Sequence, residues 1–239
     1  MSALIVSGVA AVGLAAGGFA YAANWPTSQI FGRTIVAGDD PNEIALTYDD
    51  GPNPAATPEL LAVLAKHRVR ATFFLIGRFV QEQPLLARQI AAEGHAIGCH
   101  TMTHPKLTLL PEARIRGEIG DSQKAVEDAI GAPVRLFRPP HGARRPAVMR
   151  VARELGMSTV MWNCIVGDWN PVSAETLLGR IESRVARNRE AGQGSSVVLH
   201  DGGHLGLGAS RLESVKATDL LIQRILGTKW VTPERWVRG

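Results

Sequence analysis

The chain has 239 residues, which is enough for one large domain or two small ones with a buried core. Hydrophobic residues make up 45% and charged residues 20%, the balance of an ordinary globular protein. The net charge of +4 suits contact with anionic cell-surface material, but the scattered Lys and Arg residues and the few aromatic residues argue against nucleic-acid binding.

Residues 1–24 are predicted to form a signal peptide or a membrane anchor. Residues 2–23 carry no charge, and about 20 apolar residues can cross a bilayer. Ala20-Tyr21-Ala22 matches the small-x-small pattern of a cleavage site, but no Lys or Arg precedes the apolar run. A cleaved signal peptide and an uncleaved anchor that contacts the membrane through residues 3–23 both remain open. Either would place the rest of the chain outside the cytoplasm, secreted or anchored.

Residues 25–43 are predicted to be a linker, after which strand-like and helix-like segments alternate through residues 44–239. Predicted strands cover residues 44–47, 71–76, 95–99, 134–137, 158–162, 165–166, 195–199 and 230–231. Predicted helices cover residues 57–67, 80–93, 111–130, 146–155, 173–187 and 212–226. This alternation indicates a parallel sheet, as a doubly wound fold or a (β/α) barrel. No G-x-G-x-x-G follows the first strand, so a dinucleotide-binding fold has no support.

Two adjacent acids, Asp49 and Asp50, follow the first apolar strand and precede a Gly-Pro breaker. By themselves they fit a solvated turn equally well. At the mouth of a buried strand, however, two carboxylates are costly without a cation or a shared proton.

Four more polar clusters follow later strands. His100 and His104 are spaced to reach one metal from one face of a helical turn, although alone they would be read as a surface pair. Arg138 opens a stiff Pro-Pro loop and can clamp a carboxylate. Asp168-Trp169 and His200-Asp201 follow the last strands. Because the carboxyl ends of the strands form the catalytic face of β/α proteins, five such clusters together predict an active site.

Two His and one carboxylate leave open positions on a divalent metal, which is the geometry of a hydrolytic site. The second carboxylate can then act as general base and a His from the opposite side as general acid. Adjacent acids such as Asp49 and Asp50 cannot flank one glycosidic bond, which argues against paired-carboxylate glycoside hydrolysis.

Five motifs in this order resemble those of the polysaccharide deacetylase family, the NodB homology domain of carbohydrate esterase family 4. They are Thr-Tyr-Asp-Asp-Gly-Pro from Thr47, His-Thr-x-x-His from His100, Arg-Pro-Pro-x-Gly from Arg138, Asp-Trp from Asp168 and Leu-His-Asp from Leu199. The family includes chitin, chitooligosaccharide and peptidoglycan N-acetylglucosamine deacetylases. With it we expect a distorted (β/α) barrel of about seven parallel strands, with the active site at their C-terminal face.

The resemblance also implies a role for each matched residue. Asp49 would be the base that activates water and His200 the acid that protonates the leaving amine. Asp50, His100 and His104 would hold a divalent metal, zinc first, with Co²⁺, Ni²⁺ and Mn²⁺ as alternatives. The remaining implied roles are supporting ones: Arg138 positions Asp49, Asp168 pairs with His200, the backbone N–H of His141 serves as oxyanion donor, and Trp169 and Leu199 form a slot for the acetyl methyl group.

The implied reaction is removal of N-acetyl groups from N-acetylglucosamine residues of a cell-envelope glycan or chitooligosaccharide. An O-acetyl esterase acting on acetylated xylan is the alternative, since the same site can cleave an ester, and a glycan-binding module without catalysis is disfavoured. Three positions depart from the family pattern and bear on substrate choice: Ile165 replaces an Asp, His141 a Tyr, and Cys99 an Asn or Ser. Buried free thiols are the preferred reading of Cys99 and Cys164 over a disulfide.

Overall fold

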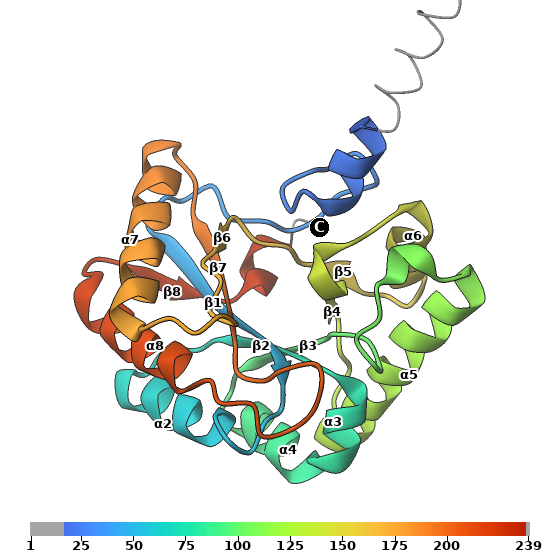
Figure 1. Ribbon diagram of the computed structural model, residues 1–239, viewed down its shortest axis with the longest axis horizontal. Coiled ribbons are helices and arrows are strands. Elements are labelled where there is room, and N and C mark those ends of the chain that lie inside the picture. Colours follow the sequence, from blue (N-terminus) through green and yellow to red (C-terminus); the bar gives the residue numbers. More distant parts are fainter. Residues whose placement is uncertain (1–16, 238–239) are drawn as a thin grey trace, which may run out of the picture.

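The structure is a computed structural model that describes residues 17–237, and its centre is one curled sheet in which every strand pairing is parallel (Figure 1). The strand order is β5-β4-β3-β2-β1-β7-β6, and β8 pairs with β1 off this path. The strands are β1 (Glu43–Gly51), β2 (Thr72–Leu75), β3 (Ala96–Cys99), β4 (Leu136–Phe137), β5 (Ser158–Thr159), β6 (Cys164–Ile165), β7 (Ser195–His200) and β8 (Lys229–Val231).

The central strand is β1, whose nine residues are all buried. It pairs with β2, β7 and β8, so both of its edges are covered. Its register with β7 sets Asp49 opposite His200. The strand continues past the predicted end at Thr47 and includes both acids. Beyond Thr47 its backbone groups still pair with β2 and β7, and this long-range pairing is not visible in the sequence.

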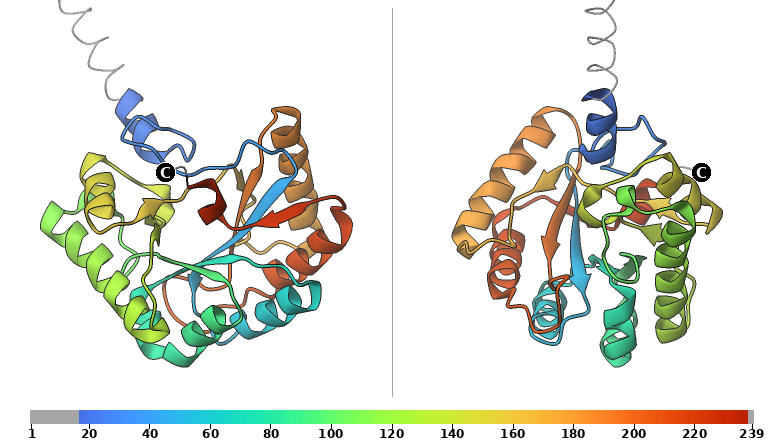
Figure 2. Two further views of the ribbon diagram at one scale, coloured as in Figure 1. Left: turned by 180° about the vertical axis from the view of Figure 1, so that it is seen from behind. Right: turned by 45° about the vertical axis from the view of Figure 1, so that its right-hand side comes forward.

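The helices lie around the outside of the sheet in an arc, seen from two further sides in Figure 2. They are α2 (Thr57–His67), α3 (Gly77–Glu82), α4 (Pro84–Ala92), α5 (Glu112–Ile130), α6 (Pro146–Glu154), α7 (Ala174–Glu190) and α8 (Leu212–Arg224), with short 3₁₀ turns η1 (Leu107–Leu109), η2 (Pro140–Gly142) and η3 (Pro233–Trp236). The helix predicted over 80–93 is two helices, because Pro84 lacks the N–H that a continuous helix needs. Gly131 ends α5 in the left-handed region, as its sequence position suggested.

The expected distorted (β/α) barrel with about seven parallel strands is confirmed, and the doubly wound alternative is wrong. Strands β1 to β5 follow one another in sequence order across the sheet, so successive right-handed crossovers place their helices on one side. Strands β5 and β6 lie at opposite edges but are joined only by residues 160–163, which therefore cross the open side of the curled sheet. At the β5 edge, Ile35 forms a parallel bridge with Val160.

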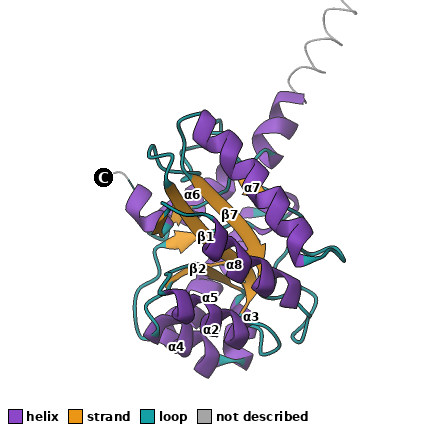
Figure 3. Cartoon of the chain, turned by 90° about the vertical axis from the view of Figure 1, so that its left-hand side faces the viewer, coloured by secondary structure: helices purple, strands orange, loops and turns teal. Residues whose placement is uncertain are grey.

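The two faces of the sheet have different cores. Ile44, Leu46 and Tyr48 of β1 face the helices and belong to the large hydrophobic cluster. The Tyr48 hydroxyl lies 2.8 Å from the Thr218 hydroxyl of α8, the helix that Figure 3 shows in front of β1 and β7. The concave face holds only small apolar clusters, around Phe74 and around Trp162. Space inside the curl is thereby left for polar side chains.

The N-terminal segment packs against the domain. Residues 17–24 are helical, and the segment lies beside β5 and α6, away from α2 and α4 (Figures 1 and 2). The buried Arg144 guanidinium donates to the carbonyl oxygens of Trp25, Pro26 and Ser28. No helix within residues 17–237 is long and apolar enough to cross a membrane. Most of the predicted signal or anchor segment, residues 1–16, lies outside the described residues, and the boundaries at 24 and 43 stay predictions.

Cys99 and Cys164 are both buried and unpaired, which confirms the prediction of free thiols. Each ends or begins a strand in the core, and burial raises the pKa of each thiol to about 12.

Candidate active site

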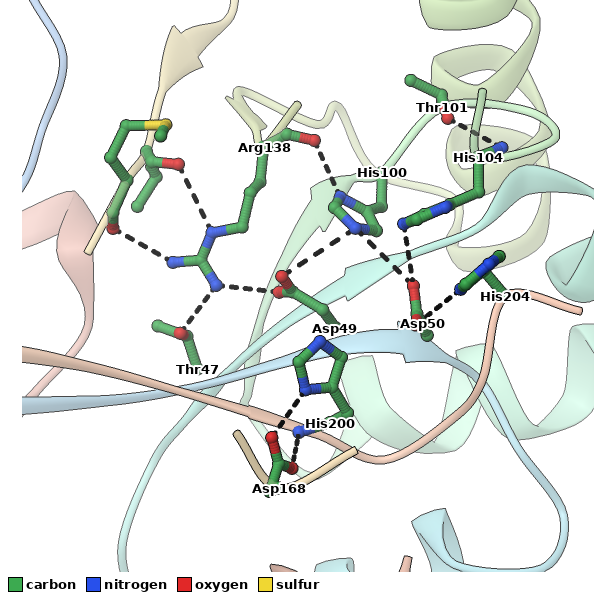
Figure 4. A network of polar contacts seen from close by, with 12 residues as sticks. Thr47, Asp49, Asp50, His100, Thr101, His104, Arg138, Asp168, His200 and His204 are labelled. Atoms are coloured by element: carbon green, nitrogen blue, oxygen red, sulfur yellow. Dashed lines mark hydrogen bonds and ion pairs between the residues drawn. The ribbon is translucent and has the colours of Figure 1, made fainter. Parts of the chain in front are cut away.

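The polar clusters predicted from the sequence meet at the carboxyl ends of the strands (Figure 4). Asp49 and Asp50 lie at the C-terminal end of β1, and His200 is the final residue of β7. The loop after β3 carries His100 and His104, and the loop after β4 begins with Arg138. The topology thus brings together side chains from residues 49 to 200 of the chain.

Asp50, His100 and His104 form a buried group whose ligand atoms all lie within 4.8 Å of one another. Oδ1 of Asp50 is 3.6 Å from Nε2 of His100 and 3.3 Å from Nε2 of His104. Among the described residues this oxygen has no hydrogen-bond partner although it is buried. Since an unpaired buried carboxylate oxygen is costly, its position between two imidazole nitrogens fits a bound cation.

The protonation states of the two histidines also fit a metal. Nδ1 of His100 lies 2.7 Å from the carbonyl oxygen of Arg138, so Nδ1–H donates and Nε2 keeps its lone pair. Burial lowers the pKa of His100 to about 3 and that of His104 to about 2. Burial also raises the pKa of Asp50. Two neutral imidazoles and one carboxylate are the donor set of a catalytic zinc site.

The backbone at this group is strained. Among the described residues other than glycine, φ is positive at Asp50, Thr101, His104 and His141, all at the site, and otherwise at Arg68, which ends α2. The prediction that His100 and His104 share a helical turn is wrong, because residues 100–106 are irregular. The hydroxyl of Thr101 accepts from the backbone N–H of His104 at 3.0 Å and fixes this loop instead.

Arg138 is fully buried and fixes Asp49. Its Nη1 donates to Oδ1 of Asp49 at 2.8 Å and to the hydroxyl of Thr47 at 2.7 Å. Its Nε and Nη2 donate to main-chain carbonyls of residues 160 and 161, and the guanidinium lies 4.1 Å from the centre of the Phe74 ring. Oδ2 of Asp49 is left facing Nε2 of His100 at 3.8 Å. One Asp49 oxygen is therefore held by the arginine while the other faces the metal group.

His200 lies on the other side of Asp49 and is held by Asp168. Its Nδ1 is 2.9 Å from Oδ1 of Asp168, and its backbone N–H donates to Oδ2 at 2.7 Å. The hydroxyl of Ser214 also donates to Oδ2. Burial alone would lower the pKa of His200, but the hydrogen bond and charge of Asp168, with Asp49 and Asp50, raise it to about 9. This imidazole is protonated at neutral pH, unlike the two near Asp50.

Of the three residues predicted to touch substrate, two lie at the mouth of the site. Trp169 is 48% exposed, with its ring 5.5 Å from that of His200, and the exposed ring of His141 lies 4.7 Å from that of His104. The structure does not bring Leu199 to the site. Successive side chains alternate along a strand, so Leu199 points away from the face of His200 and joins the core under the helices. Val198, which packs with Met161 and Trp162, shares the face of His200 instead.

The sequence reasoning gave no role to three polar residues here, two of which it had listed within its motifs. Thr47 bonds Arg138, as described above. Asp201 is fully buried, accepts from the hydroxyl of Thr57, and has a pKa that burial raises to about 7. His204 stacks on His104, with ring centres 4.5 Å apart. His200 and His204 repeat the H-x-x-x-H spacing of the first pair, which is the signal that could have revealed His204.

A cavity of about 250 Å³ adjoins the His200 side and is lined by residues such as Asp168, Trp169 and Arg211. A larger cavity of about 740 Å³, lined in part by Arg33, Met149 and Trp236, contains none of the residues of the site. Neither cavity is lined by Asp49, the Asp50 group or His200, so neither is assigned to the substrate.

Comparison with known proteins agrees with this geometry. The family model for polysaccharide deacetylase matches residues 37–160, which include Asp49, Asp50, His100, His104 and Arg138. The chain belongs to the polysaccharide deacetylase family. It is 36% identical to a chitooligosaccharide deacetylase of Azorhizobium caulinodans over 175 residues, 73% of this chain and 80% of the relative. It is 38% identical to a peptidoglycan-N-acetylglucosamine deacetylase of Bacillus cereus over 163 residues, 67% of this chain and 73% of the relative.

The structure of peptidoglycan deacetylase PdaC from Bacillus subtilis has the same fold, with a TM-score of 0.70 at 32% identity over 82% of this chain and 91% of that one. The protein is therefore a polysaccharide deacetylase enzyme, and Asp50, His100 and His104 are its candidate metal ligands.

Proposed function

We propose that this deacetylase is a metal-dependent hydrolase that removes N-acetyl groups from N-acetylglucosamine residues of a cell-envelope glycan or chitooligosaccharide. The observation that carries the proposal is the pair of opposite histidine environments around Asp49. Neutral His100 and His104 face the unpaired Asp50 oxygen on one side, and protonated His200 stands on the other. Amide hydrolysis needs both an activated water and a proton for the leaving amine.

Asp50, His100 and His104 would hold a divalent ion, Zn²⁺ first, with Co²⁺, Ni²⁺ or Mn²⁺ as alternatives. When bound, such an ion polarises the acetyl carbonyl and lowers the pKa of water. The chain prepares the site by setting the His100 tautomer through the Arg138 carbonyl and by burying all three ligands.

Asp49 is the base in this proposal. Its Oδ2 is turned toward the metal group and can take a proton from the attacking water, while Oδ1 is fixed by Arg138. A guanidinium that is itself held by Thr47 and by two main-chain carbonyls leaves Asp49 little freedom to rotate. The carboxylate is thus aimed before substrate arrives.

His200 is the acid and gives its proton to the nitrogen of the departing sugar amine. Asp168 holds Nδ1–H, so Nε2–H is the proton presented to substrate. The backbone N–H of His141 is proposed as an oxyanion donor, its residue held in the left-handed region at φ 58°. Trp169 is proposed as an apolar wall beside the acetyl group, next to His200.

We also propose that the enzyme acts outside the cytoplasm, secreted or anchored to the membrane by the uncharged N-terminal segment. The sequence of residues 2–23 supports this location, and glycans of the cell envelope would be accessible there.

An O-acetyl esterase acting on acetylated xylan is the second candidate, because the proposed base and oxyanion donor serve an ester equally well. A protonated His200 favours an amide as the substrate, because an amine leaves only when it is protonated, whereas an alkoxide leaves more readily. A glycan-binding module without catalysis would have no use for the buried Arg138–Asp49 pair.

The deciding experiment measures acetate released by the full chain from chitooligosaccharide, peptidoglycan and acetylated xylan, alongside the free amines formed. We expect acetate and amine in equal amounts from at least one of the two N-acetylated substrates. Asp49→Asn, which keeps the shape of the side chain, should abolish this release. Acetate from xylan alone would overturn the amide assignment, and near-normal turnover by Asp49→Asn would overturn the assigned base.

A further inference from the structure

We infer that His204 is a positioning residue of the candidate metal centre: its imidazole holds the second carboxylate oxygen of Asp50, so that the first oxygen alone serves as ligand. The inference rests on the proposed function, because it concerns the same metal group. It adds a residue that lies outside the five motifs and that the sequence reasoning did not identify.

The two oxygens of Asp50 face different partners (Figure 4). Oδ1 points between the Nε2 atoms of His100 and His104, at 3.6 and 3.3 Å. Oδ2 faces Nδ1 of His204 at 3.9 Å. This separation exceeds a hydrogen bond and lies within the range of an ion pair, so Nδ1–H must approach Oδ2 by about 1 Å to donate to it.

Three contacts fix His204 and its loop next to Asp50. The ring of His204 stacks on the ring of His104, with centres 4.5 Å apart and an interplanar angle of 18°. Its main-chain carbonyl accepts a hydrogen bond from the Arg78 guanidinium. Two residues earlier, Gly202 packs so closely on the main-chain carbonyl of Asp50 that a Cβ there would overlap the oxygen. The loop after β7 therefore contacts the backbone of Asp50 through Gly202 and faces its side chain through His204.

His204 is not placed as a fourth ligand. The ligand atoms of Asp50, His100 and His104 lie within 4.8 Å of one another, and His204 contributes no atom to that group. Its place is behind the carboxylate, where donors in metalloproteins orient the ligand oxygen. A carboxylate with both oxygens free can bind a cation through both. A donor on Oδ2 keeps binding to Oδ1 and leaves positions for water and the substrate carbonyl.

The test measures Zn²⁺ affinity of the full chain by competition with a chromophoric chelator, with no substrate present. His204→Ala should weaken Zn²⁺ binding about 10- to 100-fold, the usual effect of losing a partner of a metal ligand. His204→Asn should restore most of the affinity, because its amide N–H can occupy nearly the position of Nδ1–H. Leu205→Ala, a change at the 89% exposed next residue of the same loop, should leave the affinity unchanged.

Each outcome decides the role separately from the reaction. Unchanged Zn²⁺ affinity in His204→Ala would overturn the inference while leaving the deacetylase proposal intact. A loss that His204→Asn fails to restore would contradict a donor role. A wild-type chain that binds no Zn²⁺ would overturn the metal centre and this role with it. Failure to release acetate despite normal Zn²⁺ binding would count only against the proposed function.

Discussion

The two sides of Asp49 use histidine in opposite ways. On the β3 side, which comprises Asp50, His100 and His104, burial lowers the pKa of the two imidazoles to about 3 and about 2. On the β7 side, which comprises Asp168 and His200, the imidazole has a pKa raised to about 9. All of these rings are buried or largely buried, so burial alone does not set their protonation states.

The carboxylate partners explain the difference. Asp168 accepts from the main chain and side chain of His200 and from Ser214; burial alone would raise its pKa, but these donors lower it overall. A carboxylate so held stays charged and keeps a proton on His200. Asp50 has a buried oxygen with no donor among the described residues, and burial raises its pKa. The charges of the β7 side are therefore paired within the chain, whereas in the proposed function the β3 side is completed by a cation.

The largest effects are expected from removing one histidine on each side, because only one of the two changes should affect Zn²⁺ binding. His104→Ala should abolish Zn²⁺ binding and lower acetate release by about 10³-fold or more, since Lewis-acid activation contributes several kcal/mol and each 1.36 kcal/mol is tenfold. His200→Ala should lower kcat/KM by about 10²- to 10⁴-fold, the range for loss of a general acid, and leave Zn²⁺ affinity as it was. Titration with Zn²⁺ and an acetate assay on both variants measure this.

The contrast between the two sides would be wrong if His104→Ala and His200→Ala had the same effects on Zn²⁺ binding and acetate release. Loss of Zn²⁺ binding in His200→Ala would place His200 among the ligands. Full activity of the wild-type chain after chelation and dialysis would remove the metal from the β3 side. Readdition of Zn²⁺ or Co²⁺ to the chelated wild type should restore activity, which controls for unfolding during metal removal.

A smaller change tests what keeps the proton on His200. The acid works only while protonated, so kcat/KM should fall as the pH rises through about 9. Asp168→Asn removes the group that raises this pKa most, so that burial is opposed only by the charges of Asp49 and Asp50. The alkaline limb should move down toward the ordinary imidazole value of about 6.5, a shift of about 2 pH units. A pH profile of kcat/KM from pH 5 to 10 gives the answer.

An alkaline limb that stays in place in Asp168→Asn would show that another group limits the reaction at high pH. Ser214→Ala is the matched control, because it removes a donor from Asp168 while leaving the carboxylate against His200. In that variant the limb should remain well above pH 6.5.

Much of the fold and most of the site residues could be predicted, because their signals are local. The buried runs that became β1, β2 and β7 are continuous in the sequence, and Asp49, Asp50, His100 and His104 stand beside such runs. Where the sequence reasoning was wrong, the cause was long-range or conformational. The loop of His100 and His104 is set by a left-handed Thr101 and its hydroxyl, which no spacing rule reports.

Leu199 and His204 show that position in the sequence does not decide which side chains reach the site. Leu199 stands next to His200 in sequence, but strand alternation turns it to the other face, where Tyr48 also points. His204 stands outside the motifs, but Gly202 permits an approach to Asp50 that brings it over His104. Leu199 was assigned to the site because it is adjacent to His200 in sequence. His204 was not assigned to it, because its position beside Asp50 arises only in the folded chain.

The smallest expected effect lies at the contact that joins the two sides. Gly202 follows His200 by two residues and packs on the main-chain carbonyl of Asp50, with no room for a Cβ. Gly202→Ala should lower the free energy of unfolding by about 1–3 kcal/mol, the usual cost of overpacking. Gly179→Ala, in the exposed face of α7 where an added Cβ meets nothing within 4 Å, should raise it by up to about 1 kcal/mol. Denaturant unfolding of both variants measures the difference.

The same variant shows which side yields to the strain. Asp50 is held at a positive φ and by no donor on Oδ1, whereas the loop of His200 is anchored by three bonds to Asp168 from His200 and Ser214. The weaker restraint should move, so Gly202→Ala should lose Zn²⁺ affinity while the alkaline limb of His200 stays near pH 9. A shifted limb with unchanged Zn²⁺ affinity would mean that the β7 side is the more deformable one, and the contrast between the two sides would have to be reversed.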